Sequence, residues 1–180
     1  MSVFRKFIAS LGIILVMLSF GLAIRAFYPT DAIGNNTNIA TNALFTTAFI
    51  NTEGKPQNLK QYQGKIIVLN FWATWCPPCR EEMPELTQLH QEYQHKNVVV
   101  LGLALDELNL VQEFLQASPV SYPIFVADSP ETDLSEPLGN DKGVLPYTVI
   151  INADGQVVNT YFGRISKSLI EAAIEPLLSK

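Results

Sequence analysis

A pair of cysteines in the spacing Cys-x-x-Cys follows a buried-type strand, and this junction constrains the fold more than any other feature of the sequence. The run from Ile66 to Phe71 is apolar except for Asn70, as expected for a strand buried on both faces of a parallel sheet. Cys76 and Cys79 come soon after it and are the only cysteines of the chain. Two cysteines this close indicate a reactive site, because a disulfide-stapled scaffold needs more of them, spread along the chain.

The junction favours thiol–disulfide chemistry at the two sulfur atoms. One helical turn brings the cysteines close enough for a disulfide to open and close with little motion of the backbone. Cys76 is expected at the amino end of a helix, where unpaired N–H groups and the helix dipole favour its thiolate. Pro77 suits the first helical position, because its missing N–H would have no partner there. We therefore expect Cys76 to attack a partner's disulfide and the less exposed Cys79 to release the reduced partner.

The periodicity of the remaining chain predicts an α/β fold. We expect further strands at 44–50, 98–105, 124–127, 147–151 and 156–162, and helices at 81–95, at 109–117 and from 168 onward. The apolar face of the first helix would carry Met83, Leu86, Leu89 and Tyr93, and one side of the second would carry Leu110, Phe114 and Leu115. Asp154 and Gly155 predict a hairpin turn, residues 128–143 a loop, and Ser168 with Glu171 a capping box. This order of elements predicts a mixed sheet flanked by helices on both faces.

The N-terminal segment predicts attachment to a membrane. Residues 7–24 carry no charge and are rich in large apolar side chains, with Arg5 and Lys6 before them and Arg25 after them. As a helix this run would span about 27 Å, close to the roughly 30 Å hydrocarbon core of a bilayer. The expected divisions are a cytoplasmic N-terminus at 1–6, a transmembrane anchor at 7–24, a polar linker at 25–42 and a folded domain at 43–180.

A cleaved signal peptide is the alternative interpretation of the same segment. With a retained anchor the protein would sit in the inner membrane, with its catalytic domain in the periplasm or otherwise outside the cytoplasmic membrane. A cleaved signal would export the domain as well.

The segment 72–79, Trp-Ala-Thr-Trp-Cys-Pro-Pro-Cys, resembles the active-site motif of the thioredoxin superfamily, and within it that of the TlpA/ResA-like thiol–disulfide oxidoreductases. The similarity runs from about Ala43 to the C-terminus and implies a thioredoxin-like domain, for which a membrane anchor is common. Pro84 matches the proline that kinks the thioredoxin helix. Pro146 matches the proline that is cis and faces the active cysteines, so the resemblance implies a cis bond there.

The expected site combines four catalytic residues with a groove for the substrate. The catalytic residues are Cys76, Cys79, Pro146 and Glu82, and the groove residues are Trp75, Pro77, Pro78 and Leu145. Glu82 matches a glutamate of ResA-like proteins, and it would either exchange a proton with Cys79 or be an ordinary solvated helix residue. Asn70 stands where thioredoxin carries a buried acid. We expect Trp72 to be packed in the core and Trp75 to be partly exposed.

The resemblance implies an exported enzyme that reduces disulfides in partner proteins. Its substrates would be cysteines of apocytochrome c before haem attachment or of a copper centre, and its electron donor a membrane protein. A disulfide oxidant or isomerase, and a copper metallochaperone that uses the same cysteines, are the alternatives. We expect a monomer that needs no cofactor.

Charge and histidine spacing argue against two other classes of protein. The net charge is −5 and the basic residues are scattered, which argues against a nucleic-acid partner. Cys76, Cys79, His90 and His95 come near the spacing of a zinc finger. The histidines would lie about 16 Å or more along the helix from the sulfurs, so we expect no metal site and two solvated histidines.

Overall fold

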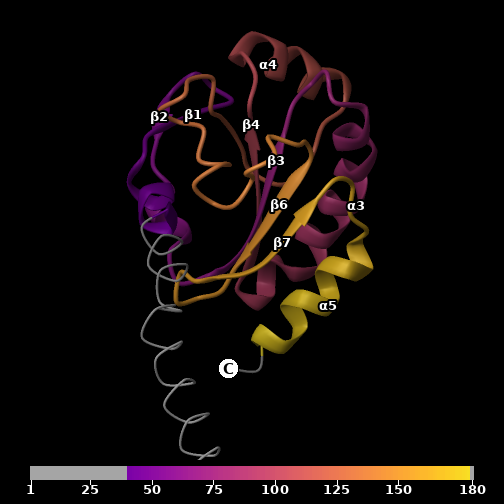
Figure 1. Ribbon diagram of the computed structural model, residues 1–180. Coiled ribbons are helices and arrows are strands. Elements are labelled where there is room, and N and C mark those ends of the chain that lie inside the picture. The colour runs from indigo at the N-terminus through magenta and orange to yellow at the C-terminus, as the bar shows by residue number, and fades with distance from the viewer. Residues whose placement is uncertain (1–39, 179–180) are drawn as a thin grey trace, which may run out of the picture. The chain divides into compact units, whose positions relative to one another are not determined.

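A seven-stranded mixed sheet organises residues 40–178, the part of the chain that the computed structural model describes (Figure 1). The strands are β1 (Phe49–Asn51), β2 (Pro56–Gln57), β3 (Ile66–Trp72), β4 (Val98–Ala104), β5 (Ile124–Val126), β6 (Tyr147–Ile151) and β7 (Val157–Phe162). They lie in the order β2-β1-β5-β4-β3-β6-β7. β3 and β5 run parallel to β4, whereas β6 is antiparallel to both β3 and β7. The α/β mixed sheet predicted from the sequence is confirmed.

The strand that leads to the cysteines lies in the middle of this sheet. β3 is hydrogen-bonded to β4 on one side and to β6 on the other, and all seven of its residues are buried. Its continuous apolar sequence follows from this position, because both faces of a central strand are covered. Asn70 is its single polar residue, and it belongs to the site described below.

Three helices contribute to the core on one face of the sheet. They are α3 (Pro77–Tyr93), α4 (Leu108–Ala117) and α5 (Lys167–Leu178). The connections through α3 and α4 both step in the same direction across the sheet, and right-handed crossovers place both helices on the same face. Figure 1 shows α3 and α5 side by side. The apolar face predicted for α3 is confirmed, since Met83, Leu86, Leu89 and Tyr93 are all buried.

A short helix at residues 40–46, together with loops, covers the opposite face. Ala40, Leu44 and Phe45 are buried in the core cluster of this face. The strand predicted at 44–50 is therefore wrong, and only Phe49–Asn51 pairs as a strand. Adjacent side chains of a strand point to opposite faces, so a strand could not bury both Leu44 and Phe45 in this way, whereas a helix brings residues four apart onto one side. The helix also includes three residues at the end of the expected linker.

Two details of the later helices differ from the sequence prediction. Leu110, expected on the apolar face of α4, is exposed, while Val111 beside it is fully buried. The capping box predicted at Ser168 is wrong, because α5 begins at Lys167 and the hydroxyl of Ser166 accepts the N–H of Leu169 at 3.4 Å. In both cases the sequence contains the expected signal, but at a residue one or two positions away from the one predicted.

The connections after β5 follow the prediction. Residues 128–143 form turns without a helix, and β6 and β7 form the expected hairpin, with Gly155 at a φ of +78° in its turn. Between residues 40 and 178 no helix has the length and apolar character needed to cross a bilayer. The expected membrane span at 7–24 lies outside the described residues.

Candidate active site

Cys76 and Cys79 form a disulfide at the amino end of α3. Cys76 is the N-cap with an extended backbone, Cys79 lies in the first turn, and their Cα atoms are 5.3 Å apart. The N–H of Cys79 donates to Sγ of Cys76 at 3.3 Å. Pro77 and Pro78 fill the first helical positions, where the N–H groups they lack would have no helical acceptor. The helix start thus brings the two sulfurs together as the spacing predicted.

The two cysteines differ slightly in exposure. Cys76 is 3% exposed and Cys79 is completely buried, so Cys76 is the sulfur nearer to solvent. The two tryptophans of the motif lie as expected: Trp75 is 68% exposed, whereas Trp72 is buried and packs against the ring of Phe114. A partner that approaches Cys76 would therefore meet an exposed aromatic ring immediately before it.

The turn that carries Trp75 and Cys76 is held by Asp106, a residue that the sequence interpretation missed. One carboxylate oxygen of Asp106 accepts both the N–H of Thr74, at 3.0 Å, and its hydroxyl, at 2.5 Å. Asp106 comes two residues after the end of β4, which pairs with the end of β3. Carboxyl ends of parallel neighbours meet at one edge of a sheet, and this signal in the sequence could have identified Asp106.

Glu82 is completely buried one turn after Cys79. Its carboxyl accepts the side-chain amide of Asn70 at 2.7 Å and the backbone N–H of Ile165 at 3.1 Å. Burial raises the pKa of Glu82 to about 7, although both hydrogen bonds and the positive charge of Arg164 lower it. A carboxyl with this pKa can give or accept a proton near neutral pH. Its burial excludes the interpretation as an ordinary solvated helix residue.

The loop before α5 is tied to α3 by the glutamate that follows one turn after Glu82. Glu85 pairs with Arg164 at 3.1 Å and accepts the backbone N–H of Lys167 at 2.7 Å. These contacts lie on either side of Ile165 and hold its N–H toward the buried carboxyl. Nothing near Glu82 in the sequence signals these partners, because they lie about eighty residues later in the chain.

Further polar groups are buried around Gly102 on the α3 face of the sheet. Asn70 also donates to the hydroxyl of Thr148 at 3.0 Å, but its carbonyl oxygen has no hydrogen-bond partner among the described residues. The same holds for Nε1 of Trp72 and the hydroxyl of Tyr122. A Cβ at Gly102 would clash with Cδ1 of Ile124, and it would lie 3.2 Å from that Nε1 and 3.1 Å from the Tyr122 ring. The absence of a side chain at Gly102 therefore leaves room for Ile124 and for these two aromatic rings.

Leu145 and Pro146 precede β6, and the peptide bond between them is cis. The cis bond that the resemblance implied is thus confirmed. The carbonyl of Pro146 accepts the N–H of Gly163 at 2.8 Å, and Leu145 is partly buried against both core clusters. The catalytic role of Pro146 and the groove role of Leu145 stay predictions.

The two histidines lie in different surroundings. His95 is exposed in the 3-10 turn η2 (Gln94–Lys96), as expected. His90 is half-buried, its Nδ1 accepts the N–H of Val100 at 3.4 Å, and burial lowers its pKa, so the prediction of a solvated side chain is wrong there. In the described part of the chain no three His, Cys, Asp or Glu side chains are arranged to hold a metal ion.

Comparison with known proteins gives concordant matches. The family model described as Redoxin matches residues 37–174. The thiol-disulfide oxidoreductase ResA of Bacillus thuringiensis (strain Al Hakam) is 33% identical over 128 residues, covering 69% of this chain and 70% of that protein. A solved thiol:disulfide interchange protein of the thioredoxin family from Chlorobium tepidum TLS is 29% identical with a TM-score of 0.63, covering 73% of this chain and 92% of that one.

A second solved structure supports the fold alone. It is a secreted thiol-disulfide isomerase from Corynebacterium glutamicum, 24% identical with a TM-score of 0.63. The match covers 71% of this chain and 78% of the isomerase.

Proposed function

Since the chain belongs to the redoxin family as a ResA-like thiol–disulfide oxidoreductase of the thioredoxin superfamily, we propose that it reduces disulfides of partner proteins outside the cytoplasm. The observation that carries the proposal is the Cys76–Cys79 disulfide at the start of α3, with the buried Glu82 one turn behind it. The direction of electron flow is taken from the resemblance to ResA-like proteins.

The arrangement supports a two-cysteine reaction. In the reduced protein, the Cys76 thiolate attacks one sulfur of the partner's disulfide, and the partner's other sulfur leaves and takes a proton. Cys79 then loses its proton, attacks Cys76 in the mixed disulfide and releases the second sulfur of the partner. Glu82, with a pKa of about 7, accepts the Cys79 proton in this step. Two electrons pass to the partner, and the Cys76–Cys79 disulfide is formed.

The substrates that we propose are protein disulfides such as those of apocytochrome c or of a copper centre, and the electron donor is a membrane protein. Residues 7–24 would anchor the chain in the inner membrane as a monomer, with residues 25–42 as the linker. The extracytoplasmic location is supported by the apolar N-terminal run. The groove would be formed by Trp75, Pro77, Pro78 and Leu145, beside Pro146.

The reduction potential of the Cys76–Cys79 pair tests this direction. The full-length chain would be equilibrated with thiol–disulfide buffers, and the fraction of disulfide would be measured by alkylation of free thiols. We expect a value near that of thioredoxin, about −270 mV, which marks a reductant. A value near −120 mV would mark an oxidant and overturn the proposed direction. Tight copper binding by the reduced chain without disulfide reduction would instead favour the metallochaperone.

A further inference from the structure

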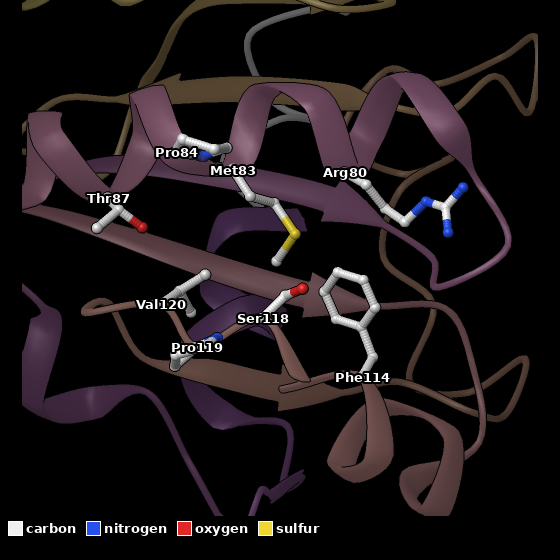
Figure 2. A pocket seen from close by; sticks show the side chains of 8 residues that line it. All are labelled: Arg80, Met83, Pro84, Thr87, Phe114, Ser118, Pro119 and Val120. Atoms are coloured by element: carbon white, nitrogen blue, oxygen red, sulfur yellow. The ribbon is translucent and has the colours of Figure 1, made fainter. Parts of the chain in front are cut away.

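A second groove, which begins on α3 at the residue after Cys79, has no part in the chemistry described above. It has a volume of about 510 Å³ and runs between α3 and the end of α4 with the segment that follows it (Figure 2). One wall is formed on α3 by Arg80, Met83, Pro84 and Thr87. The helix rises about 10 Å from Arg80 to Thr87, the length of about three residues of extended chain.

Most of the side chains that line the groove beyond Arg80 are apolar. Phe114 of α4, and Ser118 and Val120 after it, form the opposite wall. Figure 2 shows Met83 pointing from α3 toward Ser118 and Phe114. An unbranched methionine adapts to side chains of different shape, so this part of the groove suits a large apolar side chain.

Arg80 places a positive charge at the end of the groove that is nearest to Cys79 along α3. It directly follows Cys79, and its N–H donates to the carbonyl of Cys76 at 3.3 Å. Its guanidinium makes no ion pair within residues 40–178, and no acidic residue lines the groove. The charge is therefore available to a carboxylate of a bound partner.

The structure holds the disulfide form of the site, and this form reacts with a dithiol. We propose that the groove binds a segment of the dithiol protein that reduces the Cys76–Cys79 disulfide. The segment carries a large apolar side chain for the Met83 region and a carboxylate for Arg80, both close to its cysteines. This inference rests on the proposed function and specifies the electron donor by its chemistry.

The reaction served by the groove is balanced. One thiolate of the donor attacks Sγ of Cys76, the Cys76–Cys79 bond breaks, and Cys79 leaves as a thiolate that takes a proton. The donor's second thiol then loses its proton and attacks the donor sulfur of the mixed disulfide, which releases Cys76. The donor becomes a disulfide, and this chain gains two electrons and the proton taken by Cys79, while Cys76 is released as the thiolate.

Dithiol peptides test the groove directly. The oxidised full-length chain, in nanodiscs of zwitterionic lipid, is mixed with three peptides that share one Cys-x-x-Cys core and differ in two flanking residues. The flanks are leucine with aspartate, leucine with lysine, and alanine with aspartate. The second-order rate constant of reduction is measured by acid quenching and alkylation of thiols. We expect the leucine–aspartate peptide to react about three- to tenfold faster than either of the others.

Two variants should change these ratios selectively. Arg80→Glu should reverse the preference for aspartate over lysine, and Ser118→Trp, which fills the groove, should bring the leucine-to-alanine ratio close to one. Each ratio compares peptides on one variant, so a general change in the reactivity of the cysteines cancels. Lys60→Glu is the control: it changes the net charge equally, and Lys60 is exposed and does not line the groove.

Several outcomes would overturn the proposal. If the ratio of rates for the aspartate and lysine peptides is the same in the wild-type chain and in Arg80→Glu, the charge of Arg80 does not recognise the peptide. A wild-type dimer that Ser118→Trp dissociates in sedimentation would show that a second copy covers the groove. If the chain reduces protein disulfides normally while the ratios stay equal, the groove proposal alone fails; if it reduces none, the proposed function itself is wrong.

Discussion

The two faces of the central sheet bury very different side chains. On the face opposite α3, the sheet's contribution is hydrocarbon and aromatic, and the hydroxyl of Tyr147 is satisfied by the carbonyl of Leu138 at 2.9 Å. On the α3 face, Asn70, Glu82 and Thr148 are completely buried, and three polar atoms have no partner among the described residues. Both faces belong to the same strands, so the difference lies in alternate residues of one sequence.

The two faces therefore contribute differently: the face opposite α3 contributes more to stability, and the α3 face carries the chemistry. A buried polar atom without a hydrogen bond costs about 1–3 kcal/mol, so the α3 face is the less stable way to fill a core. It is also the face that carries the disulfide and the carboxyl with the raised pKa. Leu69 and Asn70, adjacent on β3, point to opposite faces, so a change at Leu69 can be compared with a change at Glu82, the hydrogen-bond partner of Asn70.

The largest effects are expected at the disulfide. Cys76→Ser should lower the turnover of protein disulfides by more than about a thousandfold, because the attacking sulfur is lost. Cys79→Ser should instead accumulate a mixed disulfide between Cys76 and the natural partner, visible on a non-reducing gel. Full multiple turnover by Cys79→Ser would show that the two-cysteine mechanism is wrong.

The next largest effect is expected at the buried carboxyl. Glu82→Gln should lower kcat/KM for a protein disulfide by about a hundredfold at pH 8, because the proton acceptor is removed. Because the pKa of Glu82 is about 7, we expect a limb near pH 7 in the wild-type pH profile, and this limb should be absent from the variant. Glu81→Gln is the matched control: Glu81 is the neighbouring residue and exposed, and its removal should change the rate less than about threefold. An unchanged profile in Glu82→Gln would assign the limb to another group.

On the opposite face a large change in stability should leave the chemistry intact. Leu69→Ala should lower the free energy of unfolding by about 2–5 kcal/mol, because it opens a cavity in a fully buried site. Urea denaturation measures this loss, and the pH profile of kcat/KM at a temperature where the variant is folded should match the wild type. A displaced limb near pH 7 would mean that the two faces are coupled through β3.

The smallest expected effect is a change in stability with pH that arises from the α3 face only. Burial raises the pKa of Glu82 from its ordinary 4.5 to about 7, so the folded protein binds this proton more tightly than the unfolded chain does. The free energy of unfolding should therefore fall by up to about 3 kcal/mol as pH rises from 4.5 to 7, and then level off. Urea denaturation across this range should show the fall in the wild type and in Leu69→Ala. A fall of the same size in Glu82→Gln would exclude Glu82 as its cause.

Local sequence patterns were enough to predict most of the fold and the centre of the site. The buried run of β3, the spacing of the cysteines and the periodicity of α3 are all signals within about twenty residues. The helix at 40–46 was missed because a short segment with adjacent apolar residues fits a buried strand or a helix equally well. Whether this segment forms a helix or a strand is decided by the sheet face that it covers.

The surroundings of Glu82 could not be predicted in the same way. The sequence places it one turn after Cys79, but its burial depends on a backbone N–H and on an amide side chain brought in from other elements. A backbone N–H carries no residue-specific signal, so nothing in the identity of Ile165 marks it as the donor. Asp106, in contrast, could have been found, because strand ends in a parallel sheet have a known arrangement.

The long separation of the groups that hold Glu82 has a consequence for the newly made chain. Its carboxyl takes one hydrogen bond from Asn70, made earlier, and one from Ile165, made 83 residues later. Both cysteines thus leave the ribosome well before the second donor exists. In that interval Glu82 is in water and ionised at neutral pH. A disulfide formed by the nascent chain would therefore arise without the buried proton acceptor, which becomes part of the site only after the C-terminal segment has folded.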